Sequence, residues 1–192
     1  MKHFLLLFLI STAFVLSAEE KNAVIDMDRV FREYYKTKIV EANLKRQADI
    51  YKEYAVKLQE EIKRLQAEFI ELRDASLNVV LTDATRESKR LAAVDKYKLL
   101  TSKEGELKDY NREKQAQLRD DQDTQRGKIL NDIKTVVKNQ AVLSGYKMVF
   151  DSKAVSVTGL PVVIYADPAA DITESVLKEL NAGYNSTKTS SK

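Results

Sequence analysis

The chain has 192 residues, in which 32 Lys and Arg stand against 29 Asp and Glu, giving a formal net charge of +3 at pH 7. It contains only five Gly and two Pro, which disfavours a loop-rich all-β fold and favours long uninterrupted helices. The absence of Cys excludes disulfides and thiol chemistry, so stability has to come from packing and association.

The N-terminus has the pattern of an export signal. Lys2 and His3 form a short basic start, residues 4–16 are apolar except for two hydroxyl side chains, and cleavage would follow Ser17 or Ala18. An apolar run of about 13 residues is too short to span a bilayer comfortably. Cleavage would also remove the only His, which excludes Ser-His catalysis and zinc sites with nitrogen ligands. We therefore expect an exported protein that is not an enzyme and that needs no metal or cofactor.

A short strand is predicted at the start of the exported chain. Ala, Ile and Met alternate with Val and Asp over residues 22–28. Val24 and Ile25 are the expected core residues of this strand. The carboxylate of Asp28 is placed to accept a hydrogen bond from the first turn of a following helix.

A helical arm is predicted over residues 29–143. This stretch contains no Pro and is dominated by Glu, Lys, Arg, Gln, Leu and Ala, which are strong helix formers. Apolar residues that alternate between spacings of four and three predict a coiled-coil seam of about four heptads. The seam consists of Leu44, Ala48, Tyr51, Ala55, Leu58, Ile62, Leu65, Phe69 and Leu72. Its expected role is packing against another helix rather than contact with a ligand.

The arm is predicted to reverse near residues 74–85. β-branched residues and Asn78 interrupt the helical pattern there, and the candidate caps for the next helix are Thr82, Asp83 and Thr85. Such a reversal produces an out-and-back hairpin, which returns the chain to the neighbourhood of its first strand.

The second helix of the hairpin is predicted over residues 84–143 and has a less regular pattern. Its apolar stripe repeats at about eleven residues, and polar residues such as Lys114 and Gln125 lie near that stripe. This pattern predicts a loosely packed seam. Gly105 and Gly127 would let the helix flex. At about 1.5 Å per residue the two helices would extend about 70 Å and 90 Å.

Two strands and a helix are predicted in the C-terminal region. The strands cover residues 146–151 and 161–166, and their expected core residues are Val149, Phe150, Val163 and Ile164. Residues 171–174 have capping-box spacing, so a helix is expected to start there and to end at Gly183.

The predicted fold class is α+β, in which a long antiparallel helical hairpin projects from a small β-rich head. The chain divides into a signal peptide (1–18), a head (19–28 and 144–183), an arm (29–143) with its tip near 74–85, and a flexible tail (184–192). Three short strands cannot build a generous core. We therefore expect the heads of several chains to associate and share a core.

The order of these segments resembles the Skp/OmpH family of periplasmic chaperones. The resemblance is carried by Val-Ile-Asp-Met-Asp-Arg-Val-Phe at 24–31, the long charged middle, Gly-Tyr-Lys-Met-Val-Phe-Asp at 145–151, Val-Ile-Tyr-Ala at 163–166 and Asp-Ile-Thr at 171–173. It implies a homotrimer with a β-barrel-like head and three helical-hairpin tentacles. It also implies that these tentacles enclose unfolded outer-membrane proteins in the periplasm without ATP.

The charge distribution is compatible with this reading. Residues 29–143 carry 25 Lys and Arg against 20 Asp and Glu, whereas the head and tail carry 6 against 9. So small an excess suits weak attraction of polypeptides but not nucleic-acid binding, and membrane contact through the tip would be weak. The candidate client contacts are Tyr34, Tyr35, Tyr54, Leu77, Val79, Val80, Leu81 and Tyr97. The alternative function is a structural coiled-coil protein of the cell envelope without chaperone activity.

Overall fold

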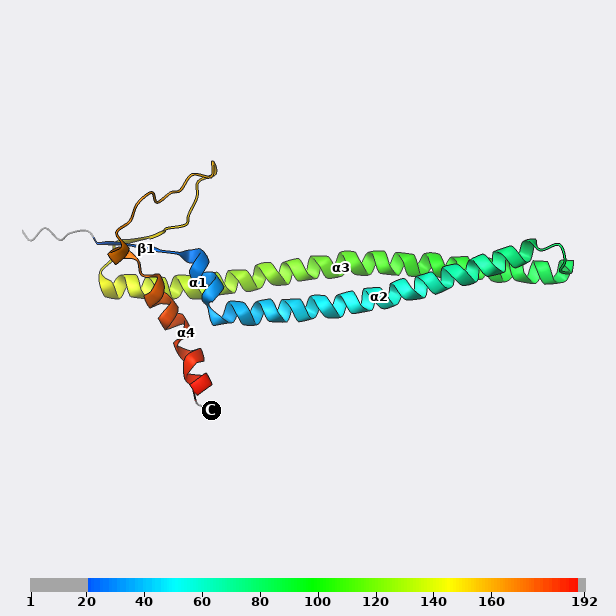
Figure 1. The fold of residues 1–192 in the computed structure, drawn as a ribbon, viewed down its shortest axis with the longest axis horizontal. Helices are drawn as coiled ribbons and strands as arrows, with labels where there is room; N and C mark the ends of the chain where they lie inside the picture. The colour runs from blue at the N-terminus through cyan, green and yellow to red at the C-terminus, as the bar shows by residue number, and fades with distance from the viewer. Residues whose placement is uncertain (1–20, 190–192) are drawn as a thin grey trace, which may run out of the picture.

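The computed structural model describes residues 21–189, so the predicted signal peptide lies outside the described residues. Figure 1 shows a long two-helix arm that projects from a small head. The elements are β1 (Asn22–Ile25), α1 (Met27–Glu33), α2 (Tyr35–Leu77), α3 (Asp83–Ser144), β2 (Met148–Asp151), the short 3-10 helix η1 (Pro168–Ala170) and α4 (Thr173–Thr189). The predicted helical hairpin is confirmed.

The arm is formed by α2 and α3, which run antiparallel and meet at a tight tip. α2 ends at Leu77, and the Asn78 side chain accepts a hydrogen bond from the Val80 amide at 3.0 Å. Thr82, one of the three candidate caps, is the N-cap of α3, and its hydroxyl accepts from the Thr85 amide at 3.3 Å. The left-handed conformation of Gly145, with φ of 72°, ends α3.

The head sheet has two strands, because the hairpin returns the chain beside its start. β1 and β2 pair in parallel, with Asn22 opposite Met148 and Ile25 opposite Asp151. The head core draws on β1, α1, the end of α3, and α4. Its buried members are Ala23, Ile25, Val30, Tyr34, Ile129, Ile133, Ile172, Val176, Leu177 and Leu180. The last turns of α3 therefore belong to the head core rather than to the free arm.

The start of the first helix differs from the prediction. The strand ends at Ile25, so α1 begins at Met27 and its N-cap is Asp26, whose carboxylate accepts from the Arg29 amide at 2.7 Å. Asp28 lies inside the first turn and pairs instead with Arg32 at 2.8 Å. The assignment of Asp28 as the cap was wrong because the strand is shorter than the apolar alternation suggests.

The strand predicted over residues 161–166 is not formed. Instead, residues 152–167 make a long excursion away from the sheet (Figure 1). Local bonds satisfy part of its backbone, including Ser156 amide to Leu160 carbonyl and Val162 amide to Ala154 carbonyl, both at 2.8 Å. Gly159, with φ of 79°, makes the turn between them. The local turn therefore competes with pairing to the sheet within one chain.

α4 is longer than predicted. Asp171 accepts a bond from the Thr173 amide at 2.8 Å at its start, and the helix continues through Gly183 to Thr189. The prediction that Gly183 ends the helix was wrong. Glycine weakens a helix by about 1 kcal/mol but ends it only where the chain turns to a left-handed conformation, which Gly183 does not adopt. The last residues of the predicted tail lie outside the described residues.

Candidate functional site

The apolar seam of α2 lies against α3 within the same chain. None of its nine residues is exposed: Leu58 and Leu65 are buried, and the other seven are partly buried. Ala93 and Leu100 are the buried residues of α3 in this part of the arm. Packing of the hairpin on itself therefore occupies the seam.

A ladder of polar contacts runs along one flank of the hairpin. Lys96 pairs with Glu68 at 2.6 Å, and one heptad away Lys103 pairs with Glu61 at 3.4 Å. The Tyr54 hydroxyl continues the ladder by donating to Glu106 at 3.1 Å. The Lys96 ammonium lowers the pKa of the Glu68 carboxyl below its ordinary value. These contacts fix the register between two helices that share few buried residues.

Lys114, one of the polar residues predicted to loosen the second helix, has aromatic partners in the structure. The Lys114 ammonium lies 5.3 Å from the centre of the Tyr51 ring and 5.8 Å from that of Tyr110. The Gln47 amide donates to Asp121 at 3.3 Å. A cation over two aromatic rings offsets part of the cost of placing Lys beside an apolar seam. Sequence periodicity alone could not identify these partners.

The base of the arm contains a break between α1 and α2, which was predicted as one continuous helix. Tyr34 adopts an extended conformation there, with φ of −66° and ψ of 126°. Its ring is buried in the head core, and its hydroxyl donates to Asp132 of α3 at 3.3 Å. Burial raises the pKa of Tyr34. The break allows the ring to enter the core while α2 leaves along α3.

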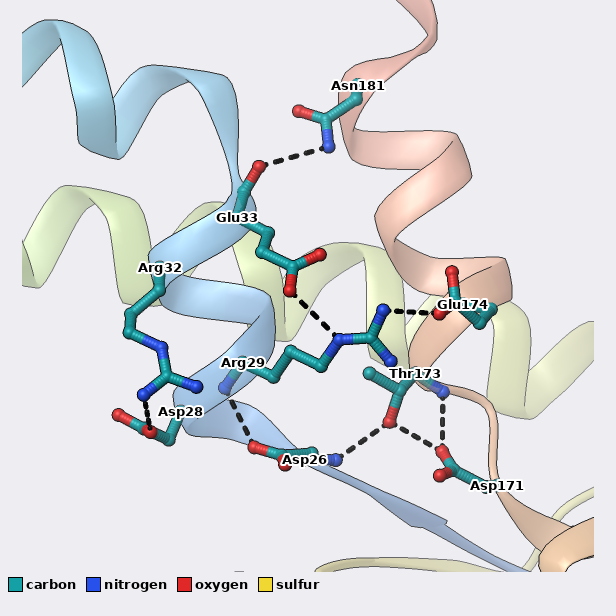
Figure 2. Close-up of polar contacts among 9 residues, drawn as sticks. All are labelled: Asp26, Asp28, Arg29, Arg32, Glu33, Asp171, Thr173, Glu174 and Asn181. Atoms are coloured by element: carbon teal, nitrogen blue, oxygen red, sulfur yellow. Dashed lines mark hydrogen bonds and ion pairs between the residues drawn. The ribbon is translucent and has the colours of Figure 1, made fainter.

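One side chain of α4 satisfies the backbone at this break. Asn181 accepts from the Tyr35 amide at 2.9 Å and donates to the Glu33 carbonyl at 3.3 Å. Figure 2 shows Asn181 reaching from α4 to Glu33 at the end of α1. The Tyr184 ring on the same helix stacks on Tyr35, with ring centres 4.8 Å apart. α4 therefore fixes the direction in which the arm leaves the head. The sequence pattern missed Asn181 because nothing local links it to a backbone so far away in the chain.

A second polar cluster joins the start of α1 to the start of α4 (Figure 2). Arg29 bonds both Glu33 of its own helix and Glu174 of α4. The Thr173 hydroxyl accepts from the Asp26 amide at 2.9 Å and donates to Asp171 at 2.5 Å. These bonds hold the start of α4 against the start of α1, beside the head core.

The eight candidate client contacts fall into different environments. The assignment of Tyr34 was wrong for this chain, because its side chain is only 3% exposed. Tyr35 is partly buried under Tyr184, and Leu81 is partly buried at the tip. The remaining five are exposed, with values of 43% for Tyr54, 55% for Tyr97, 71% for Leu77, 82% for Val79 and 87% for Val80.

Some of the expected core residues of the head are buried and others are exposed. Val24 and Ile25 are buried and Val149 packs against the core. In contrast, Phe150 is 40% exposed, Val163 is partly exposed and Ile164 is 93% exposed. Ile164 therefore has no core to enter within one chain. The same is true of apolar neighbours on the excursion, namely Val155, Val157, Leu160, Val162 and Tyr165.

The described residues offer no site for a metal or for a membrane crossing. Within residues 21–189, no group of three or more acidic or His side chains is placed to hold a metal ion. No helix in the same part of the chain is long and apolar enough to cross a bilayer. The candidate site consists of the exposed apolar residues of the arm and of the head excursion.

Comparison with known proteins agrees with this architecture. The model of the OmpH-like outer membrane protein family matches residues 21–180, which covers both the head and the arm. The chain belongs to this family. The chaperone protein Skp of Yersinia enterocolitica is 28% identical over 160 residues, covering 83% of this chain and 85% of that protein. The crystal structure of an OmpH-like protein from Caulobacter crescentus CB15 matches with a TM-score of 0.52 and 20% identity, covering 86% of each chain. That likeness shows that the two proteins share a fold. The names of both relatives contain the word chaperone.

Proposed function

We propose that this OmpH-like protein is an ATP-independent holdase that acts in the periplasm and keeps unfolded outer-membrane proteins from aggregating. The observation that carries the proposal is the division of the chain into a small head and an arm of two long helices. The arm contributes only four buried apolar residues outside the head core, namely Leu58, Leu65, Ala93 and Leu100, yet it contains most of the chain. The length of the arm therefore extends its surface far from the head and does not build a separate hydrophobic core. Membership of the family and the description of its relatives as chaperones support the same function.

We also propose that the working form is a homo-oligomer, a trimer by the resemblance, in which heads share their exposed apolar segments. Support comes from the excursion between β2 and η1, where Val157 is fully exposed and Ile164 is 93% exposed. Soluble monomers rarely expose so many large apolar side chains in one segment, and such patches mark association surfaces. Strand β2 pairs only with β1 among the described strands, so its outer edge can accept a strand from another chain.

Dilution of an unfolded outer-membrane β-barrel protein from urea into buffer without ATP tests the holdase proposal. Light scattering should stay low when the exported chain is present and rise when it is absent. Scattering that is unchanged by the chain would contradict the holdase and favour a structural envelope protein. Bovine serum albumin at equal mass controls for nonspecific suppression.

A further inference from the structure

A groove lies between α2 and α3 in the half of the arm nearer the tip. Its volume is about 430 Å³, and its floor includes Phe69 of α2 together with Ala93, Val94 and Tyr97 of α3. The Phe69 and Tyr97 rings are 5.4 Å apart at their centres and inclined by 45°. Tyr97 is 55% exposed and Val94 is 41% exposed. The groove is therefore an aromatic surface that is open to solvent.

Two small residues among those lining the groove explain its location. Ser76 and Ala93 face this part of the hairpin, and side chains of that size do not fill the space between two long helices. The polar ladder does not cover the space either. Lys96 and Glu68 lie on one flank, whereas Tyr97, one residue further on, is rotated by about 100° to the other flank.

The charged side chains that line the groove are all cationic. Arg73, Arg90 and Lys98 border it, and no carboxylate is among its lining residues. The Arg73 guanidinium lies 6.0 Å from the centre of the Phe69 ring. Arg73, Arg90 and Lys98 form ion pairs with Asp74, Glu87 and Asp95, respectively. The pairs with Asp74 and Asp95 are at least half exposed, so they bind weakly and can yield to another carboxylate. Arg90 holds Glu87 through two hydrogen bonds of 2.7 Å each, so this pair yields less readily.

We propose that this groove binds aromatic side chains of unfolded polypeptide segments that also carry carboxylates. Two rings provide the contact area for an aromatic side chain, and the cationic border attracts acidic residues beside it. A transmembrane β-strand alternates apolar and polar residues, so an unfolded strand can present both on neighbouring positions. The inference rests on the proposed holdase function and assigns a particular site on the arm to the client.

A single tryptophan tests the site directly, because the chain contains none. Tyr97→Trp places the reporter in the groove, and Leu99→Trp places it on the same helix outside the lining residues. The titrant is a peptide of about ten residues, the length of one barrel strand, with alternating tyrosine and aspartate. We expect saturable quenching or a blue shift for the reporter at 97 and none for the reporter at 99. Equal responses at both positions would overturn the assignment.

Two substitutions of matched exposure separate the groove from the rest of the arm. Val94→Asp brings a carboxylate onto the floor and within reach of Arg90, whereas Leu99→Asp makes the same change at a residue that is 44% exposed. The Val94 variant should bind the labelled tyrosine–aspartate peptide about tenfold more weakly, and the Leu99 variant should bind like the parent. Thermal melting followed by circular dichroism checks that the helical arm remains folded in both variants. Equal affinities of folded variants would refute the groove as the binding site.

The border is tested with Arg73→Gln combined with Arg90→Gln. This variant should lose the preference for the aspartate peptide over a peptide of alternating tyrosine and lysine. A preference that persists would contradict the role of the border. Vesicles of phosphatidylglycerol are titrated against the Tyr97→Trp reporter in parallel. A response to vesicles together with none to the peptides would assign the groove to anionic lipid and overturn the proposal.

The aggregation assay distinguishes a wrong assignment of the groove from a wrong holdase proposal. If the parent chain does not suppress aggregation of the outer-membrane protein, the holdase function is wrong whatever the peptide does. If the parent suppresses aggregation and Val94→Asp suppresses it at the same molar ratio, the holdase stands and the groove is wrong. We expect Val94→Asp to need about two to three times more protein than Leu99→Asp, since other arm contacts remain.

Discussion

Replacement of Asn181 tests whether α4 fixes the direction of the arm. Asn181→Leu keeps the approximate volume of the side chain but leaves the Tyr35 amide without an acceptor and the Glu33 carbonyl without this donor. An unsatisfied buried donor costs about 1 to 3 kcal/mol, and a lost hydrogen bond about 0.5 to 1.5 kcal/mol. Because Asn181 is only partly buried, water can replace part of this loss. We therefore expect a destabilisation of about 2 kcal/mol.

Urea unfolding followed by circular dichroism measures this change, with all variants at one protein concentration because association contributes to stability. Ala182→Leu is the matched control, since it introduces the same residue at the neighbouring exposed position of α4. Asn181→Asp keeps an acceptor for the Tyr35 amide, so its free energy of unfolding should fall by about half as much as that of Asn181→Leu. A second measurement uses spin labels on Val79→Cys at the tip and Lys153→Cys in the head, which is practical because the chain has no other Cys. The distance distribution should broaden in Asn181→Leu. An unfolding midpoint and a distance distribution equal to those of the Ala182 control would refute the role of Asn181.

Three further predictions follow from the same structure. Ile164→Asp should dissociate the oligomer in analytical ultracentrifugation, whereas Ile50→Asp, at a 64% exposed arm position, should not; an unchanged sedimentation coefficient for the first variant would contradict a shared head. Gly105→Ala and Gly127→Ala meet no atoms within 4 Å, so each should stabilise the arm by about 0.5 to 1 kcal/mol and together they should narrow the range of client sizes that are protected. Equal protection of small and large clients would argue against flexing at these residues. Lys96 lowers the pKa of Glu68, and Lys103 lowers the pKa of Glu106. The stability contributed by these two ionised carboxylates is therefore complete above the ordinary carboxyl pKa, and it is lost as the pH falls through the lowered pKa values. The melting temperature of the parent should therefore fall more steeply below about pH 4.5 than that of Glu68→Gln, and parallel pH profiles would contradict the ladder.

The sequence predicts the arm well because helix geometry imposes a local period. The seam from Leu44 to Leu72 recurs at helical spacing, and the change in composition near Asn78 marks the tip. The strand over 161–166 was wrong for a different reason. Valine and isoleucine indicate a preference for extended backbone, but a strand also needs an adjacent edge, and the turn at Gly159 satisfies part of this backbone locally.

The base of the arm could not be predicted from local patterns. Tyr34 was expected on the arm surface, yet a break in the helix turns its ring into the head core. At that break the Tyr35 amide donates a hydrogen bond to Asn181, which belongs to a helix at the other end of the chain. The groove near Phe69 was missed because the seam pattern gives the positions of apolar residues but not the space that Ser76 and Ala93 leave unfilled. Contacts between distant segments decide both features.

The most direct test of the holdase account is the mass of the complex formed with one client. The exported chain is mixed with an unfolded outer-membrane β-barrel protein during dilution from urea without ATP, and mass photometry or native mass spectrometry weighs the soluble species. The account predicts an assembly of three chains that gains the mass of one client while light scattering stays low. An assembly that never gains client mass, together with aggregation of the client, would contradict it.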